Sequence, residues 1–227
     1  MFSSILLAPL LLRVSFAAPI LEQRQSSCAE IHIIAARGST EAPGPGSLST
    51  LATLIQAAYP GTDLESIVYP ALLYPYDESS SNGTAAVTSQ LTEYVNECPD
   101  SKVVLIGYSQ GAQILLDSLC GGGGVFGLGP ATPPINPSIS SHVTAIVQYG
   151  DPRHLANEPY DEGTSDHNGL FPRILPSQNC NAFADIIHSW CDAGDPFCSD
   201  GFDLAAHLDY PTKYDTDAAA FVQSILG

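Results

Sequence analysis

Short, mostly apolar runs alternate with stretches of helical spacing along this chain. Runs typical of strands buried on both faces lie at 31–36, 66–69, 103–106, 143–149 and 186–190. Apolar residues recur three and four positions apart at 47–58, 84–94, 114–119 and 215–226, which predicts four helices, the first capped by Ser47. Because strands and helices alternate, we expect an α/β fold whose parallel sheet is covered on both faces.

One serine lies between a predicted strand and a predicted helix. Gly107-Tyr108-Ser109-Gln110-Gly111 follows the strand at 103–106 and fits the pattern G-x-S-x-G. Glycines two positions to either side of the serine let a strand and a helix approach closely around a sharp turn. Such a turn exposes the serine hydroxyl and places the backbone N–H of Gln110 at a helix N-terminus, where a developing oxyanion is stabilised. This context favours a nucleophile elbow over a chance match in a chain with 19 glycines.

A serine nucleophile needs a histidine base, and the order of residues in elbow enzymes is serine, acid, histidine. This order excludes His32, which lies within the first predicted strand and is expected to be structural. Five later histidines remain, at positions 142, 154, 167, 188 and 207. We favour His207, because it is expected in a loop with apolar neighbours, whereas His188 lies within a predicted strand.

The acid should be an aspartate between the elbow and His207. The sequence offers Asp192, Asp195, Asp200 and Asp203. Asp195 is favoured because Cys191 and Cys198 are close enough to fix its loop, and an orienting carboxylate must be held still. Ser39 follows the first predicted strand and is the candidate for a second oxyanion donor; the alternative is an ordinary turn serine.

The segment 121–138 is rich in glycine and proline and is expected to be a loop. Its residues 122–127 match G-x-G-x-x-G, but no strand precedes them and no helix follows, so we expect no dinucleotide site. The sequence contains neither C-x-x-C nor H-E-x-x-H, so neither a metal nor another cofactor is expected. The polar stretch 151–185 is expected to be irregular.

The N-terminus has the features of an exported protein. Residues 1–17 predict a signal peptide, residues 18–27 a short leader, and residues 28–227 a single domain. The six cysteines all follow the leader, which argues for three disulfides in a secreted chain, although fifteen pairings are possible. Asn82-Gly83-Thr84 is an acceptor for N-glycosylation.

The net charge is −17, with 7 basic against 24 acidic residues. Such a charge repels nucleic acids and anionic membranes, so we expect neither as a partner. An uncharged substrate and a monomeric protein are the expectations.

Four ordered motifs together resemble the fungal cutinase and acetylxylan esterase family over about residues 28–226. They are Ala-Arg-Gly-Ser-Thr at 36–40, Cys-Pro at 98–99 ahead of the G-x-S-x-G motif, the segment 191–198, and His-Leu at 207–208. The resemblance implies a lidless three-layer sandwich around a five-stranded parallel sheet, resembling the α/β-hydrolases. It also implies a catalytic triad of Ser109, Asp195 and His207, an oxyanion hole formed by Ser39 and Gln110, and disulfides Cys28–Cys98, Cys191–Cys198 and Cys120–Cys180.

The resemblance implies that the substrate is an ester of a plant cell-wall polymer, but it does not decide which polymer. Gly150-Asp151-Pro152-Arg153 and the spacing of twelve between Asp195 and His207 resemble acetylxylan esterases, which we favour. The apolar residues at 204–208 resemble cutinases instead, and 160–185 departs from both branches. A secreted recognition protein with a silent site is the alternative from another class, whereas a lipase is disfavoured because no lid-like insertion is evident.

Overall fold

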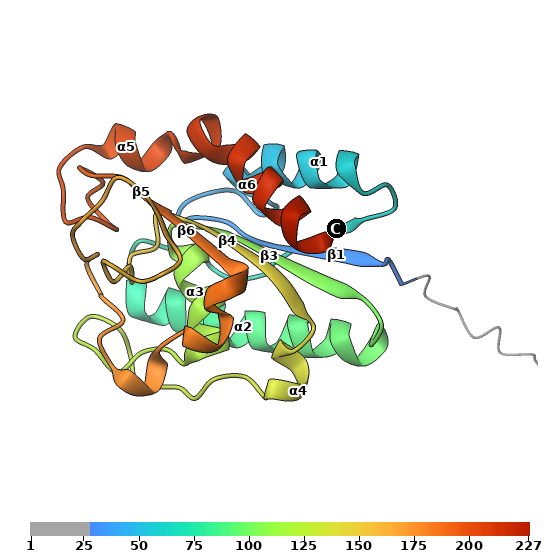
Figure 1. Ribbon diagram of the computed structural model, residues 1–227. Coiled ribbons are helices and arrows are strands. Elements are labelled where there is room, and N and C mark those ends of the chain that lie inside the picture. Colours follow the sequence, from blue (N-terminus) through green and yellow to red (C-terminus); the bar gives the residue numbers. More distant parts are fainter. Residues whose placement is uncertain (1–27) are drawn as a thin grey trace, which may run out of the picture.

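The computed structural model describes residues 28–227, so the predicted signal peptide and leader lie outside the described residues (Figure 1). Six parallel strands form one sheet in the order β2-β1-β3-β4-β6-β5. The strands are β1 (Ile31–Ala36), β2 (Asp63–Ser66), β3 (Lys102–Tyr108), β4 (Val143–Tyr149), β5 (Asp161–Gly163) and β6 (Ile187–Cys191). The α/β class is therefore confirmed.

Helices cover both faces of the sheet and complete three layers (Figure 1). They are α1 (Ser49–Ala58), α2 (Tyr76–Glu97), α3 (Gln110–Cys120), α4 (Pro137–Ser140), α5 (Leu204–Leu208) and α6 (Tyr210–Leu226), with short 3-10 turns at Gly46–Leu48, Pro176–Gln178 and Asn181–Ile186. Alternate residues of the strands serve the two cores: Ile33 packs with α1 and α6, whereas Ile34 packs with α2 and α3. The sheet is thus buried on both faces, which explains the apolar runs of its central strands.

The sheet has six strands rather than the expected five. The additional strand β5 lies in the stretch expected to be irregular and consists of Asp161, Glu162 and Gly163. It pairs with β6 through its backbone at the edge of the sheet. A short polar edge strand buries few side chains, so it leaves no apolar pattern in the sequence.

Several predicted boundaries are wrong because polar residues belong to strands or helices that were expected to be apolar. The edge strand β2 covers Asp63–Ser66 instead of 66–69, and its polar residues are partly exposed. Helix α2 begins at Tyr76 rather than at 84, because the serine-rich stretch and Gly83 belong to the helix. A Cβ at Gly83 would lie 2.8 Å from Ile114 Cδ1, so this glycine allows α2 to pack closely on α3. Ser47 does not cap α1; its backbone N–H and hydroxyl both donate to Glu41.

Three disulfides join the pairs that the family resemblance implies. Cys28–Cys98 ties the segment before β1 to the end of α2, and Cys120–Cys180 ties the end of α3 to the loop before β6. Cys191–Cys198 closes a short loop after β6. The glycine-rich segment after α3 is a loop, as expected for 121–138 apart from the short helix α4 at its end.

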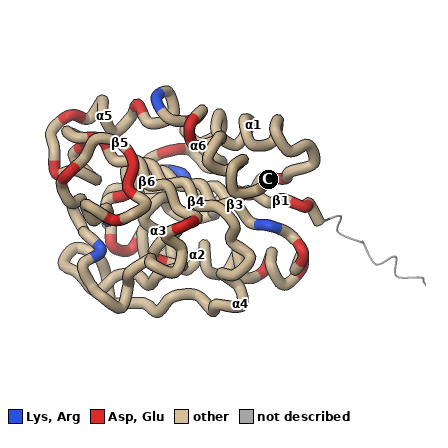
Figure 2. The backbone as a smooth tube through the Cα atoms, viewed as in Figure 1, with Lys and Arg blue, Asp and Glu red and all other residues tan. Residues whose placement is uncertain are grey.

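Acidic residues occur along many of the described elements, and only a few basic residues lie between them (Figure 2). Arg37, Arg153 and Arg173 are buried, and Arg153 and Arg173 both donate to Asp117 Oδ1 of α3. Lys213 of α6 donates to Asp192 at 2.7 Å. None of the described helices is both long enough and apolar enough to cross a membrane.

Asp215 of α6 makes the stability of the fold dependent on pH. Its side chain is buried, one carboxylate oxygen accepts the Tyr149 hydroxyl at 3.0 Å, and burial raises its pKa from 3.8 to about 6. The folded state therefore holds this proton more tightly than the unfolded chain does. The stability that the proton confers is complete below about pH 4 and is lost as pH rises to about 6.

We expect Asp215→Asn to remove this part of the pH dependence. Between pH 4 and pH 7, its free energy of unfolding, measured with urea, should fall less than that of the unmodified protein. Asp217→Asn, on the exposed side of the same helix, should behave like the unmodified protein. An equal fall in the Asp215→Asn variant would contradict the prediction.

Candidate active site

Ser109 occupies a sharp turn between β3 and α3. Its backbone dihedrals are φ 55° and ψ −122°, in a region that non-glycine residues rarely adopt. A Cβ at Gly107 would lie 2.7 Å from Ala112 Cα, and one at Gly111 would lie 1.8 Å from the carbonyl oxygen of Ala36. Both glycines are therefore required for the strand, the turn and the helix to meet in this way.

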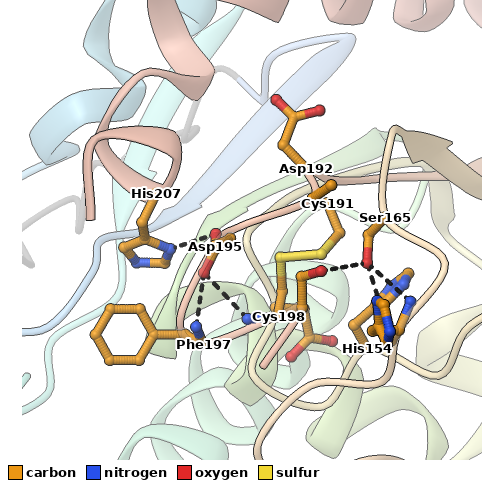
Figure 3. The surroundings of a disulfide bond; sticks show 12 residues. His154, Ser165, Cys191, Asp192, Asp195, Phe197, Cys198 and His207 are labelled. Carbon is orange, nitrogen blue, oxygen red and sulfur yellow. Dashed lines mark hydrogen bonds and ion pairs between the residues drawn. A yellow bond between two sulfur atoms is a disulfide. The ribbon is translucent and has the colours of Figure 1, made fainter. Parts of the chain in front are cut away.

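Asp195 and His207 form a buried pair (Figure 3), and His207 lines the same cavity as Ser109 of the elbow. Asp195 lies in the loop closed by Cys191–Cys198, and His207 lies in the short helix α5 rather than in the expected loop. His207 Nδ1 lies 2.7 Å from Asp195 Oδ2. Asp195 Oδ1 accepts the backbone N–H groups of Phe197 at 2.7 Å and Cys198 at 3.1 Å.

The electrostatics of the pair keep Asp195 ionised. Burial alone would raise its pKa, but hydrogen bonds from His207, Phe197 and Tyr210, together with the charge of His207, lower it below the usual value. The clipped loop therefore presents a fixed carboxylate to the imidazole, which is the arrangement that orients a histidine base.

His207 is held in place from several sides. The Tyr108 hydroxyl, from within the G-x-S-x-G motif, donates to the backbone carbonyl of His207 at 3.0 Å. The Phe197 and His207 ring centroids are 4.5 Å apart, and a Cβ at Gly150 would lie 2.8 Å from His207 Cε1. The elbow thus holds the backbone of His207, and the loop after β4 packs closely against its imidazole.

Ser39, Ser109 and His207 line one cavity of about 480 Å³. Its remaining walls are mostly apolar and come from Leu73, Tyr76, Phe171, Phe197, Leu204 and Leu208, among others. Ser39 Oγ is buried but has no hydrogen-bond partner. An unpaired buried hydroxyl beside a serine is a suitable donor for a ligand oxygen.

The contacts of Arg37 and Gly38 that hold the backbone next to Ser39 were not identified from the sequence. Gly38 packs against the elbow, since a Cβ there would lie 3.3 Å from Ser109 Cβ, and its N–H donates to Glu41 Oε2 at 2.6 Å. The buried Arg37 guanidinium donates to the carbonyls of Glu41, Ile67 and Tyr69. Both residues shortly precede Ser39 in sequence, but the bonds from Arg37 to Ile67 and Tyr69 depend on the chain that follows β2.

The other histidines and aspartates that were considered as base or acid do not line the cavity that contains Ser109. His32 is buried in β1 beside Asp63 and stacks on Tyr94, and His188 stacks on Phe221. His142, His154 and His167 do not line the cavity that contains Ser109. Asp192 binds Lys213 and Tyr214, and Asp203 accepts the backbone N–H of Ala205 as the cap of α5.

Solved structures and curated relatives resemble this chain over most of its length. An acetylxylan esterase structure at 0.90 Å resolution superposes with a TM-score of 0.80 and 38% identity, covering 88% of this chain and 100% of that one. The acetylxylan esterase of Hypocrea jecorina is 39% identical, covering 88% of this chain and 68% of the relative. Acetylxylan esterase 2 of Talaromyces purpureogenus is 38% identical over 92% of this chain and 91% of its own, and cutinase 11 of Verticillium dahliae is 38% identical over 91% and 72%.

The fold, the elbow and these relatives define a carboxylic ester hydrolase of the α/β type. The family model for Cutinase matches residues 27–226. The chain therefore belongs to the cutinase family.

Proposed function

We propose that this protein is a secreted serine esterase that works through an acyl-enzyme, with Ser109, His207 and Asp195 as its triad. The observation that carries the proposal is the 2.7 Å contact between His207 Nδ1 and Asp195 Oδ2, next to a cavity shared by His207 and Ser109. With Nδ1 engaged by the carboxylate, the imidazole presents Nε2 as the base.

The reaction has two halves. Ser109 Oγ attacks the ester carbonyl while His207 Nε2 takes its proton, and His207 then gives this proton to the departing alcohol. Water attacks the resulting acyl-serine with His207 again as the base, which releases the carboxylic acid and restores the serine. Asp195 stabilises the imidazolium that forms in each half.

Ser39 and Gln110 are the proposed oxyanion donors. Ser39 brings its unpaired buried hydroxyl to the cavity that contains Ser109. Gln110 is the first residue of α3, so its backbone N–H has no acceptor within the helix. Donors aimed at the tetrahedral intermediate are each worth about 10²- to 10³-fold in rate.

Acetyl esters of xylan are the proposed substrate. Two relatives that are 39% and 38% identical and cover most of this chain are named acetylxylan esterases. Export through residues 1–17, with a glycan on the exposed Asn82 of α2, belongs to the same proposal because it would bring the enzyme to the polymer.

The alternative substrate, cutin or another ester with longer acyl chains, is favoured by a specific surface feature. Four exposed leucines, Leu73, Leu170, Leu204 and Leu208, line the cavity. The fully exposed Phe202 lies two positions before Leu204, and the 89% exposed Tyr74 follows Leu73. An apolar rim of this kind suits contact with a waxy polymer.

A series of nitrophenyl esters from acetate to palmitate distinguishes these possibilities. We expect kcat/KM of the purified protein to be highest for acetate, and acetate to be released from acetylated xylan. A maximum at butyrate or beyond would favour cutinase activity instead. No turnover of any ester would favour a silent site and contradict the proposal.

A further inference from the structure

We infer that Tyr210 is a positioning residue of this site, whose hydroxyl fixes the Asp195 carboxylate in the orientation that His207 requires. The inference rests on the proposed function, since it assigns to Asp195 and His207 the roles of acid and base. Tyr210 is the first residue of α6 and lies three positions after His207. One short segment therefore carries both side chains that contact Asp195.

The Tyr210 hydroxyl is oriented by its own contacts. It donates to Asp195 Oδ2 at 2.7 Å, which is the same oxygen that His207 Nδ1 contacts. Its oxygen accepts the backbone N–H of Asp192 at 2.9 Å. The other neighbour of the hydroxyl is the disulfide sulfur of Cys198 at 3.2 Å, which is a much weaker acceptor than a carboxylate, so the hydrogen points at Asp195. Each oxygen of Asp195 thus takes part in two hydrogen bonds, and rotation of the carboxylate would break them.

The tyrosine ring is as firmly held as its hydroxyl. Tyr210 is fully buried, and its ring stacks on Tyr149 of β4 with centroids 5.9 Å apart. The hydroxyl therefore connects the loop that carries Asp195 to a helix anchored on the sheet.

Tyr210 stays protonated and so remains a donor. Burial and the charge of Asp195 raise its pKa above the usual value. The other charged or titratable groups around the pair are Asp192, His154, Tyr108 and Lys213. The Asp192 carboxylate points away from His207 in Figure 3 and is bound by Lys213, so it does not compete for the imidazole.

The test compares Tyr210→Phe with Tyr149→Phe, using the best nitrophenyl ester. Both variants remove a buried hydroxyl that donates to an aspartate, but only Tyr210 touches Asp195. We expect Tyr210→Phe to lower kcat about 10-fold with little change in KM, because a bond to a charged group is lost. The acid limb of its kcat/KM profile should move to higher pH, because a carboxylate with one donor fewer holds the imidazolium more strongly.

Tyr149→Phe should leave kcat and the acid limb unchanged. Equal kcat and equal acid limbs in the two variants, with both folded by circular dichroism, would overturn the inference. Site-specific 3-fluorotyrosine at position 210 keeps the ring and makes the phenol a stronger donor, so it carries the test if the phenylalanine variant does not fold. It should move the acid limb to lower pH; a shift to higher pH, or none, would overturn the inference.

Asp195→Asn separates this inference from the proposed function. If that variant retains full activity, the proposed roles of Asp195 and His207 fail, and the inference fails with them. If it is inactive while Tyr210→Phe matches Tyr149→Phe, only the role of Tyr210 fails.

Discussion

Ester hydrolysis should be abolished when Ser109 is replaced by alanine, while the fold remains intact. The change removes the attacking oxygen but keeps both glycines of the turn, so the strand, elbow and helix are preserved. Removing a serine nucleophile lowers kcat by about 10⁴- to 10⁶-fold. The measurements are kcat/KM on nitrophenyl acetate and labelling by a fluorophosphonate probe, which reacts only with an activated serine.

Ser89→Ala is the matched control, since Ser89 is exposed on α2. The kcat/KM of this variant and its labelling by the probe should equal those of the unmodified protein. Retained esterase activity in a folded Ser109→Ala variant would contradict the assignment of the nucleophile.

The substitution Asp195→Asn should lower kcat by about 10⁴-fold, which is the second large effect that we expect. The backbone N–H groups of Phe197 and Cys198 both point at the Oδ1 position, so they select the amide oxygen of the asparagine. Its NH₂ group must then face His207 Nδ1. The imidazole would accept there and carry its own proton on Nε2, where it can no longer act as the base.

Asp200→Asn provides the comparison, because Asp200 is exposed and follows the same clipped loop. We expect it to retain nearly full activity. An Asp195→Asn variant with kcat within about threefold of the unmodified protein would exclude Asp195 as the orienting acid.

The central part of the fold could be predicted because burial leaves a pattern in the sequence. Strands β1, β3 and β4 are covered on both faces and appear as apolar runs, and the elbow between β3 and α3 has required glycines. Edge strands β2 and β5 are polar, since they are held by backbone pairing more than by side-chain burial. They were misplaced or missed for that reason.

In the candidate site, too, some residues could be identified from the sequence and others could not. Ser109, Asp195 and His207 could be named because their order, their motif and the flanking cysteines are local features of the sequence. The roles of Tyr210 and Arg37 could not, because each acts through hydrogen bonds to residues brought near by folding: Tyr210 to Asp195, and Arg37 to the carbonyls of Ile67 and Tyr69. A tyrosine that packs in a core and one that also binds a catalytic carboxylate look alike in sequence.

The scarcity of surface cations has a practical consequence for attaching the enzyme to a solid support. The chain has two lysines, and the hydrogen bond from Lys213 to Asp192 raises the pKa of Lys213, which keeps that amine protonated and unreactive. Lys102 lies at the start of β3, at the opposite end of the strand from Ser109. Coupling through the Lys102 amine would therefore tether the molecule at the end of β3 remote from Ser109 and leave the cavity facing the bulk polymer.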